Sequence, residues 1–345
     1  MLFLSALRRA CVVPSVQRRW LSAPADRLLL IKELRGQTGA PVNDVKAALQ
    51  TSNWDLDAAM SELRRKGLAA ATKKAARHAA EGLVGMARGD GVVAVVEINS
   101  ETDFVARNSQ FRALVGSAAA AALAVSAPRP GCAAELDGEV LRAARMPGGG
   151  TLEEAVASVA ASVRENVRLR RGFRLAAPGA LVGAYLHQKA GDEAGRIAGL
   201  VALASSQPLA GAGAEQAQEL AHKLAMQVVA AAPRFLDRSA VPAEALEAES
   251  RVLREQALSS GKPEKIVDKI VAGRLDKYYG EVCLAEQAFI MDGDLKVQDV
   301  LKRTGKQVGS ELRLTGFLRV QVGEGLEQEQ KDFAAEVAET LKAAA

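Results

Sequence analysis

One pattern that occurs twice constrains the fold of this chain more than any other feature. Residues 81–85 (Glu-Gly-Leu-Val-Gly) and residues 179–183 (Gly-Ala-Leu-Val-Gly) each open a unit of strand, turn and strand. The later strands and the helices that follow them are predicted at residues 92–98, 108–124, 197–204 and 214–231. Glycine permits tight turns, and each strand pair can bury one face against its own helix. The sequence therefore predicts an α+β fold with antiparallel sheets, in two similar halves at residues 81–178 and 179–345.

The composition agrees with this fold class. At 345 residues the chain is long enough for two or three domains, and its hydrophobic content of 49% can fill cores of that size. Aromatic residues make up only 4%, which together with abundant Ala and Leu favours helices over an all-β sandwich. The net charge of +4 is spread along the sequence and forms no basic stripe, so we expect no direct contact with nucleic acid. No apolar run approaches the length of a membrane span, so we expect no membrane insertion.

The first 24 residues have the composition of an organelle transit peptide. They contain no acidic residue, and four arginines lie among apolar side chains: Arg8, Arg9, Arg18 and Arg19. Such a leader indicates import into an organelle, most simply the mitochondrial matrix, with the plastid as the alternative. A secretory signal fits less well, because two arginines interrupt the apolar stretch. A disordered tail with a chance charge bias is the remaining interpretation. Cleavage is expected near residues 19–22.

Residues 27–67 have the pattern of a compact module of three short helices. Apolar residues recur on one face of the first helix, which residues 39–41 (Gly-Ala-Pro) interrupt. After the second helix, Asp55 can cap a third, which we expect to end at Gly67. Residues 68–80 are then an Ala-rich connector to the two halves.

Further elements lie in the later part of the first half and within the second one. Residues 128–150 contain prolines and three consecutive glycines and are predicted to be a loop, and a helix is expected at residues 152–167. Residues 244–279 give two narrow apolar seams with charged flanks around a turn, a pattern that suits an antiparallel coiled-coil hairpin. The last strand and a final amphipathic helix are expected at residues 317–325 and 333–341.

Residues that usually carry catalysis or bind metals form no constellation in this sequence. No Gly-x-x-x-x-Gly-Lys-Ser/Thr loop for phosphates occurs. Neither the histidines nor the cysteines have metal-ligand spacing; they are His78, His187, His222, Cys11, Cys132 and Cys283. Three distant cysteines fit a reducing compartment without disulfides. We therefore expect no cofactor and no metal. Cys283 is interpreted as a small buried hydrophobe, and His222, beside apolar neighbours, as a structural residue.

Residues 97–108 (Glu-Ile-Asn-Ser-Glu-Thr-Asp-Phe-Val-Ala-Arg-Asn) are the most specific stretch of the chain. A β-branched strand ends there in a polar turn whose side chains can cap the next helix. Phe104 follows Asp103 without a spacer. Composition alone predicts a strand–turn–helix joint in which Phe104 packs inward.

The order of residues in this stretch resembles the Thr-Asp-Phe-Val signature of the elongation factor Ts family. Members of this family are the nucleotide-exchange factors of the GTPase elongation factor Tu. Residues 32–40, 165–171 and 261–292 carry the same resemblance, which extends over residues 27–341. It implies an N-terminal ubiquitin-associated-like module, a duplicated α+β core and a protruding antiparallel coiled-coil hairpin. The chain departs from the family at three positions. Val45, Ala47 and Arg164 stand where the family often has Cys, Lys and Gly, respectively.

The resemblance also implies a function and a set of contact residues. The chain would be a non-catalytic factor that promotes GDP release from elongation factor Tu during polypeptide elongation. Asp103 and Phe104 would enter the nucleotide domain of the partner and displace the elements that hold its Mg²⁺. Val167 and Leu169 would shape the apolar surface around this wedge, with His187 beside it. The implied contact residues are Lys32, Arg35, Lys46, Thr102, Asp103, Phe104, Val105, Val167, Leu169 and His187.

Two other classes of function compete with this hypothesis. A ubiquitin-like-binding or scaffold protein without exchange activity is suggested by the N-terminal module alone, but it leaves the Asp-Phe turn, the repeat and the hairpin unexplained. An enzyme that uses Cys283 has no supporting residues around that thiol. The stoichiometry stays open, including a homodimer within a two-to-two complex with the GTPase. Whether the hairpin touches the partner is open as well.

Overall fold

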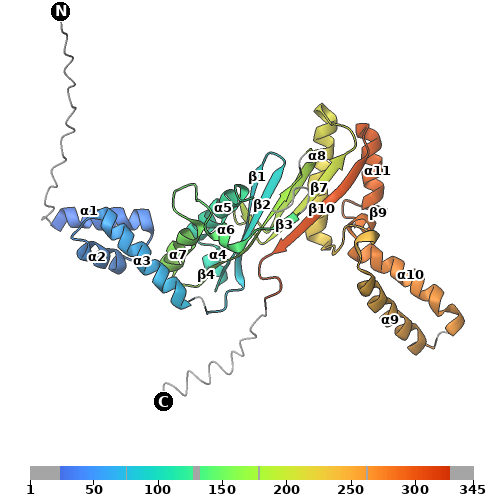
Figure 1. Ribbon diagram of the computed structural model, residues 1–345, viewed down its shortest axis with the longest axis horizontal. Coiled ribbons are helices and arrows are strands. Elements are labelled where there is room, and N and C mark those ends of the chain that lie inside the picture. The colour runs from blue at the N-terminus through green and yellow to red at the C-terminus, as the bar shows by residue number, and fades with distance from the viewer. Residues whose placement is uncertain (1–23, 75, 127–132, 178, 262, 327–345) are drawn as a thin grey trace, which may run out of the picture. The chain divides into compact units, whose positions relative to one another are not determined.

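The computed structural model describes residues 24–74, 76–126, 133–177, 179–261 and 263–326 (Figure 1). The chain forms two compact units, one up to Lys66 and one from Gly67 onward. Runs of helices and runs of antiparallel strands follow one another along the chain, so the predicted α+β class is confirmed. The predicted transit peptide as far as residue 23 and the predicted helix at residues 333–341 lie outside the described residues.

The N-terminal unit is built from three helices. They are α1 (Pro24–Thr38), α2 (Val42–Thr51) and the first turns of α3 (Leu56–Lys74). Five buried side chains form its small core: Leu34, Val45, Ala48, Leu49 and Ala59. Asp55 caps α3 as predicted, because its Oδ1 accepts a hydrogen bond from the N–H of Ala58 at 2.9 Å.

The predicted end of the third helix at Gly67 is wrong, because α3 continues to Lys74. A Cβ atom at Gly67 would lie 3.4 Å from the Cβ of Ala161 in α7 (Leu152–Val163). The glycine therefore marks a close approach of two helices and not a helix end. An interior glycine costs a helix only about 1 kcal/mol relative to alanine, and the Ala-rich sequence that follows tolerates this cost.

The first sheet of the larger unit has five antiparallel strands in the order β3-β4-β2-β1-β6. The strands are β1 (Glu81–Gly89), β2 (Val92–Ser100), β3 (Ala133–Glu135), β4 (Val167–Ala176) and β6 (Ala194–Gly195). One face of the sheet packs on α5 (Ser109–Leu123) and α7, where Ile98, Phe111 and Leu152 are fully buried.

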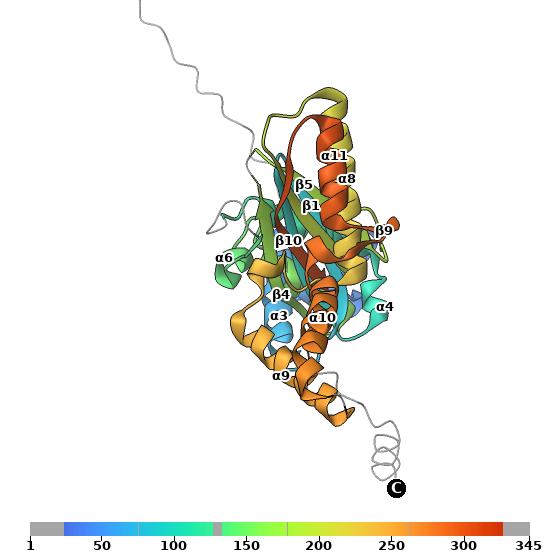
Figure 2. The ribbon, with the colours of Figure 1, turned by 90° about the vertical axis from the view of Figure 1, so that its right-hand side faces the viewer.

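The second sheet has three antiparallel strands in the order β10-β7-β5. They are β5 (Leu181–His187), β7 (Ile197–Ser205) and β10 (Leu312–Gln321). One face is covered by α8 (Gly211–Ala231) and α11 (Val297–Val308), which lie side by side in Figure 2. A separate ribbon of β8 (Ala288–Phe289) and β9 (Asp292–Lys296) precedes α11.

The repeated glycines have the same role in both halves. A Cβ at Gly85 would lie 2.3 Å from the carbonyl oxygen of Val115 in α5, and a Cβ at Gly183 would lie 1.9 Å from that of Ala221 in α8. Each glycine therefore lets its strand approach the backbone of its own helix. The repeat is thus a device for strand–helix packing.

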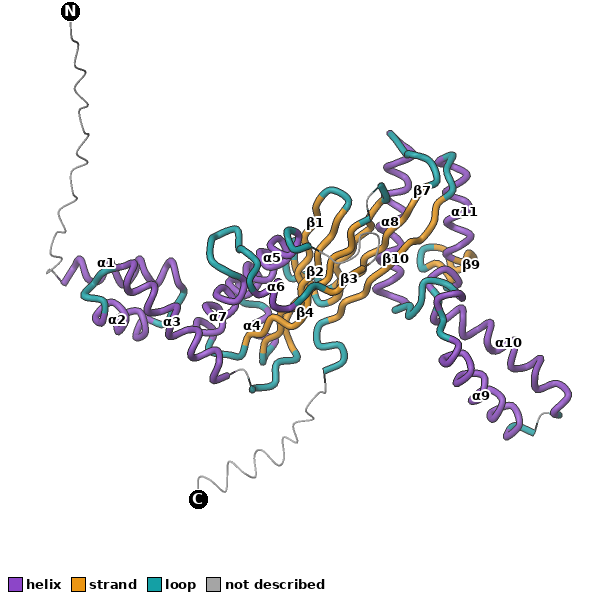
Figure 3. The backbone as a smooth tube through the Cα atoms, viewed as in Figure 1, coloured by secondary structure: helices purple, strands orange, loops and turns teal. Residues whose placement is uncertain are grey.

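The two sheets face one another across a second apolar core, which includes Val84, Val95, Leu175, Leu186 and Leu200. Because α5 covers the far face of the first sheet and α8 that of the second, the layers run helix, sheet, sheet, helix. Figure 3 shows the strands between these helices. The halves are not separate bodies, since β6 of the second half pairs with β1 of the first.

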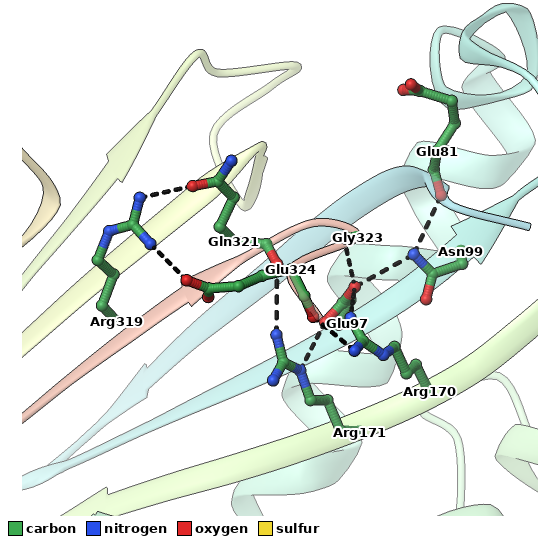
Figure 4. Close-up of polar contacts among 9 residues, drawn as sticks. All are labelled: Glu81, Glu97, Asn99, Arg170, Arg171, Arg319, Gln321, Gly323 and Glu324. Carbon is green, nitrogen blue, oxygen red and sulfur yellow. Dashed lines mark hydrogen bonds and ion pairs between the residues drawn. The ribbon is translucent and has the colours of Figure 1, made fainter. Parts of the chain in front are cut away.

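A buried charge cluster also joins the halves (Figure 4). Glu97 of β2 is fully buried, and its Oε1 accepts from Nη1 of Arg170 at 2.9 Å and from the N–H of Gly323 at 2.8 Å. Its Oε2 accepts from Nε of Arg171 at 2.6 Å. The register of β2 and β4 shifts at Glu97, where β4 carries one extra residue. Such a bulge re-aims side chains, and it allows two consecutive arginines to reach one carboxylate.

Two predictions for the later part of the first half are wrong. The helix expected at residues 152–167 ends at Val163, because Arg164 adopts a left-handed conformation with φ 62° and its N–H closes the last turn. Val163 and Val167 have helical spacing, but Val167 begins β4. The loop predicted at residues 128–150 contains β3 and α6 (Gly138–Arg142), which Asp137 caps.

The predicted hairpin region contains two helices, α9 (Ala243–Ser259) and α10 (Glu264–Val282). Four buried residues form their seam: Leu253, Ala257, Val267 and Val271. Supercoiling of this pair stays a prediction. Short 3-10 helices flank it at Arg238–Ala240 and Leu284–Glu286. The last strand, expected at residues 317–325, begins earlier, at Leu312, and ends at Gln321.

Candidate functional site

The polar turn after β2 leads into a helix of four residues, α4 (Asp103–Ala106). Thr102 caps this helix with extended backbone, and its Oγ1 accepts from the N–H of Val105 at 3.5 Å. A polar side chain at the N-cap satisfies a backbone donor that has no partner within the helix. The sequence therefore stops the strand and starts a new helix within two residues.

Phe104 and its neighbours in α4 face opposite ways. The Phe104 side chain is 76% exposed, whereas Val105 and Ala106 are 7% and 5% exposed and belong to the core beneath α5. The expectation from composition that Phe104 packs inward is thus wrong. A large exposed aromatic ring on a helix that is anchored from below is a group that can enter a partner surface.

Asp103 lies beside Phe104 at the start of α4. Its Oδ2 accepts from Nη2 of Arg107 at 2.8 Å, one turn away, and both side chains are exposed by more than a third. An exposed pair of this kind contributes only about 0–1 kcal/mol to stability. The carboxylate is therefore accessible to a partner and is not required by the fold.

The turn is held from outside by the loop that joins α7 to β4. Glu165 accepts two hydrogen bonds from Thr102: its Oε2 from the N–H at 3.0 Å and its Oε1 from Oγ1–H at 2.7 Å. In the opposite direction, Oε1 of Glu101 accepts from the N–H of Asn166. Nδ2 of Asn166 in turn donates to the carbonyl of Arg77 at 2.7 Å.

Two of the predicted contact residues lie in the core, and a third is half-buried beside it. Val105 and Val167 are 7% and 5% exposed, and Leu169 is partly buried against the same cluster. Val167 therefore presents little surface beside α4, whereas the half-buried Leu169 presents part of its side chain, and a contact of either residue with a partner stays a prediction. Their β-branched and apolar side chains follow the period of two of β4, which places Val167 and Leu169 on the inner face.

His187 is exposed at the end of β5, beside Tyr185 of the same strand. The Tyr185 hydroxyl lies 3.3 Å from Nδ1 of His187, and the Tyr185 ring meets the His222 ring edge-on with centroids 5.8 Å apart. None of the hydrogen bonds or ring contacts of His187 among the described residues reaches α4. His222 is exposed as well, although its Nδ1 lies 2.9 Å from the carbonyl oxygen of Ala184.

Lys32, Arg35 and Lys46 belong to the N-terminal unit. Lys32 and Arg35 are exposed on α1, and Lys46 is exposed on α2. All three side chains are therefore free of the small core of that unit and can meet a partner.

The structure offers little for metal or thiol chemistry. Within the described ranges, no group of three or more His, Cys, Asp or Glu side chains has the arrangement to hold a metal ion. Cys283 is fully buried, and burial raises the pKa of its thiol. A protonated, inaccessible thiol is a poor nucleophile, which argues against an enzyme based on Cys283. No helix in the described part of the chain combines the length and the apolar character that crossing a bilayer requires.

Three partners of the turn were not foreseen from the sequence. The resemblance singled out Glu165 and Asn166 but gave them no role, and Arg107 drew no prediction. A helix cap signal finds Thr102 because it is local. The bond between Thr102 and Glu165 spans 63 residues, and no local pattern indicates it.

The chain is similar to proteins of one family over most of its length. Residues 101–324 match the sequence model of the family described as Elongation factor TS. The match begins at Glu101, directly at the turn that carries Thr102, Asp103 and Phe104. It ends at Glu324, next to the Gly323 amide that binds Glu97.

Three relatives extend this similarity to the N-terminal unit. Elongation factor Ts of Rhodospirillum rubrum is 47% identical over 315 residues, which cover 91% of this chain and 97% of that protein. Elongation factor Ts of Paramagnetospirillum magneticum is 45% identical over 310 residues, 90% of this chain and 95% of its own. A protein of Ostreococcus tauri named "Elongation factor Ts, mitochondrial" is 43% identical over 338 residues, with 94% and 95% covered.

Proposed function

This chain belongs to the elongation factor Ts family, and from that premise we propose how it acts on its partner. It is a guanine-nucleotide exchange factor that promotes GDP release from elongation factor Tu during polypeptide elongation. In our proposal α4 is the working element: Phe104 enters the nucleotide domain of the GTPase, and Asp103 accompanies it.

The exposure of Phe104 is the single observation that carries this proposal. A ring that stays 76% exposed on a helix with a buried opposite face contributes little to the stability of the fold, and its apolar surface can leave water when a partner binds. Mg²⁺ bridges phosphate oxygens of a bound nucleotide, so moving the elements that hold the ion weakens GDP binding. Exchange then needs no bond to be made or broken by this chain.

Linkage sets a condition on the mechanism. If this chain weakens the binding of GDP by a given ratio, GDP must weaken the binding of this chain to the GTPase by the same ratio. In our proposal the same coupling holds for GTP, so that reloading with GTP releases the exchange factor, which can act again. The competing scaffold hypothesis predicts binding without this reciprocity.

The test is release of fluorescent GDP from purified elongation factor Tu. We expect the wild-type chain to accelerate release, and Phe104→Ala to reduce the acceleration by about 10- to 100-fold, as for aromatic hot spots. Val140→Ala is the matched control, because Val140 is an exposed apolar residue (52%) on α6 of the same unit. Binding of wild-type chain without faster GDP release would support the scaffold class.

We also propose roles for the outer parts of the chain. The three-helix unit is a ubiquitin-associated-like contact module that presents Lys32, Arg35 and Lys46 to the GTPase. The pair of α9 and α10 is a coiled-coil arm that extends the contact surface. Light scattering of the purified complex distinguishes a one-to-one assembly from a two-to-two assembly with a homodimer of this chain.

For location we propose the mitochondrial matrix. The support is the acid-free, Arg-bearing leader and the name of the relative from Ostreococcus tauri. Import of the full chain into isolated mitochondria, with loss of the leader, is expected. Import into isolated chloroplasts alone would favour the plastid instead.

A further inference from the structure

We propose that Glu165 is a positioning residue of the exchange reaction: its carboxylate fixes Thr102 and thereby the direction in which Phe104 points. This inference rests on the proposed function of Phe104. It concerns a residue that touches neither nucleotide nor metal and that acts through the start of α4.

Both oxygens of the Glu165 carboxylate are engaged with one residue. Thr102 donates its backbone N–H to Oε2 and its hydroxyl hydrogen to Oε1. Because the Thr102 hydroxyl donates its hydrogen to Glu165, a lone pair of Oγ1 is free to accept a hydrogen bond from the N–H of Val105. Glu165 thus orients the N-cap, and charge-assisted bonds of this kind are stronger than neutral ones.

A second set of bonds holds the same loop in the opposite direction. Glu101 accepts from the backbone N–H of Asn166 and pairs with Nη1 of Arg77 at 3.5 Å. Asn166 is 5% exposed, and its side chain donates to the carbonyl of Arg77. Residues 101–102 and 165–166 therefore bind one another reciprocally, with one carboxylate from each side.

This arrangement matters for Phe104 because α4 is too short to hold itself. Four residues form barely one turn, and an isolated turn is unfavourable in water. Val105 and Ala106 anchor the inner face in the core, but Phe104 is 76% exposed, so burial does little to fix the direction of its ring. The two hydrogen bonds from Thr102 to Glu165 supply the missing constraint at the start of the helix. Misplacement by about 1 Å can cost a reaction about 100-fold.

The experiment measures GDP release from elongation factor Tu against factor concentration, which separates the rate at saturation from the half-saturating concentration. Glu165→Ala should lower the saturating rate about 10-fold, with a smaller change in half-saturation. Glu153→Gln, on the exposed start of α7, is the control for charge. In a Phe104→Ala background, Glu165→Ala should cause no further loss, since its effect passes through Phe104.

Hydrogen exchange gives a readout independent of activity. In Glu165→Ala the amide of Thr102 should lose protection, while the amides of β2 and α5 keep theirs. If Glu165→Ala unfolds, Thr102→Ser and Thr102→Val test the same bond: serine keeps the hydroxyl and should retain exchange, and valine should lose it.

The outcomes separate the two proposals. Full activity of Phe104→Ala would reject the proposed function of the wedge. Loss of activity in Phe104→Ala with full activity in Glu165→Ala would reject the positioning role alone. Losses that multiply in the double variant would also overturn it, because they show an effect that bypasses Phe104.

Discussion

Phe104 and Val105 are adjacent in the sequence and point in opposite directions, one 76% exposed and the other 7%. This contrast gives a matched pair of variants. Phe104→Ala should leave the free energy of unfolding nearly unchanged and reduce GDP release about 10- to 100-fold. Val105→Ala should lower the free energy of unfolding by about 1–3 kcal/mol, because it removes buried methyl groups. Urea unfolding and fluorescent GDP release measure both. A loss of stability in Phe104→Ala that matches Val105→Ala would show that Phe104 acts as a core residue.

Asp103→Asn should reduce exchange while the protein stays folded, and the loss should depend on Mg²⁺. Asparagine keeps the size and the capping ability of aspartate, and the pair with Arg107 is exposed, so stability should change by about 0–1 kcal/mol. The carboxylate is expected to act on groups that hold the metal of the GTPase. Its contribution should therefore shrink when a chelator has removed the metal. Equal losses with Mg²⁺ and with chelator would leave Asp103 as an ordinary contact.

The sequence predicts the parts of the fold that depend on neighbouring residues. The strand expected at residues 92–98 and the helix expected at residues 108–124 depend on local residues, and β2 and α5 confirm both predictions. The end of α7 could not be found this way, because it depends on the left-handed conformation of Arg164. The hydrogen bond between Glu97 and the amide of Gly323 could not be predicted either, since the two residues are 226 positions apart in the sequence.

The candidate site divides along the same line. The local sequence motif identifies Thr102, Asp103 and Phe104. Whether each side chain faces solvent or the core depends on the packing beneath α4, which the motif does not contain. Val105 and Val167 were therefore expected at the surface and lie inside. The hydrogen bonds between Thr102 and Glu165 require the loop after β2 to meet the loop before β4, and the antiparallel pairing of these two strands brings the loops together.

Glu97→Gln should be among the most damaging single changes in the larger unit. The amide cannot balance the charges of Arg170 and Arg171, whose side chains are only 17% and 22% exposed. Breaking a buried ion pair by removing one partner typically costs about 3–5 kcal/mol. Urea unfolding measures the loss. Glu139→Gln, which breaks the pair with Arg142 on the surface, is the control and should cost about 0–1 kcal/mol. Similar values for the two variants would show that the cluster adds no stability.

Stability should fall in acid partly through Glu286. Two hydrogen bonds from Arg238, and a further one from Lys296, hold the pKa of this carboxyl below its ordinary value of 4.5, although burial opposes the shift. In the pH range between the folded and unfolded pKa values, the unfolded chain binds more protons. The contribution of Glu286 is therefore complete above the ordinary value and is lost as the pH falls through the lowered one.

The corresponding measurement compares wild type with Glu286→Gln. At neutral pH the variant should be less stable by about 1–3 kcal/mol, the usual worth of hydrogen bonds to a charged group. This difference should shrink in urea unfolding experiments as the pH falls below 4.5. A difference that stays constant over that range would mean that Glu286 does not stabilise the fold through its charge.

Removing the N-terminal unit should weaken binding to elongation factor Tu much more than it slows GDP release at saturation. The unit has its own core and no part in the α4 turn, so it should add contact area and effective concentration. Because α3 runs on to Lys74, a cut after Gly67 would leave a helix fragment, and the truncated chain should begin at Ala76. This choice keeps Arg77, which pairs with Glu101 beside Thr102. Titration of GDP release gives the two parameters separately. Equal half-saturating concentrations for the full and truncated chains would show that the unit serves another partner, and a large fall in the saturating rate would show that it takes part in exchange itself.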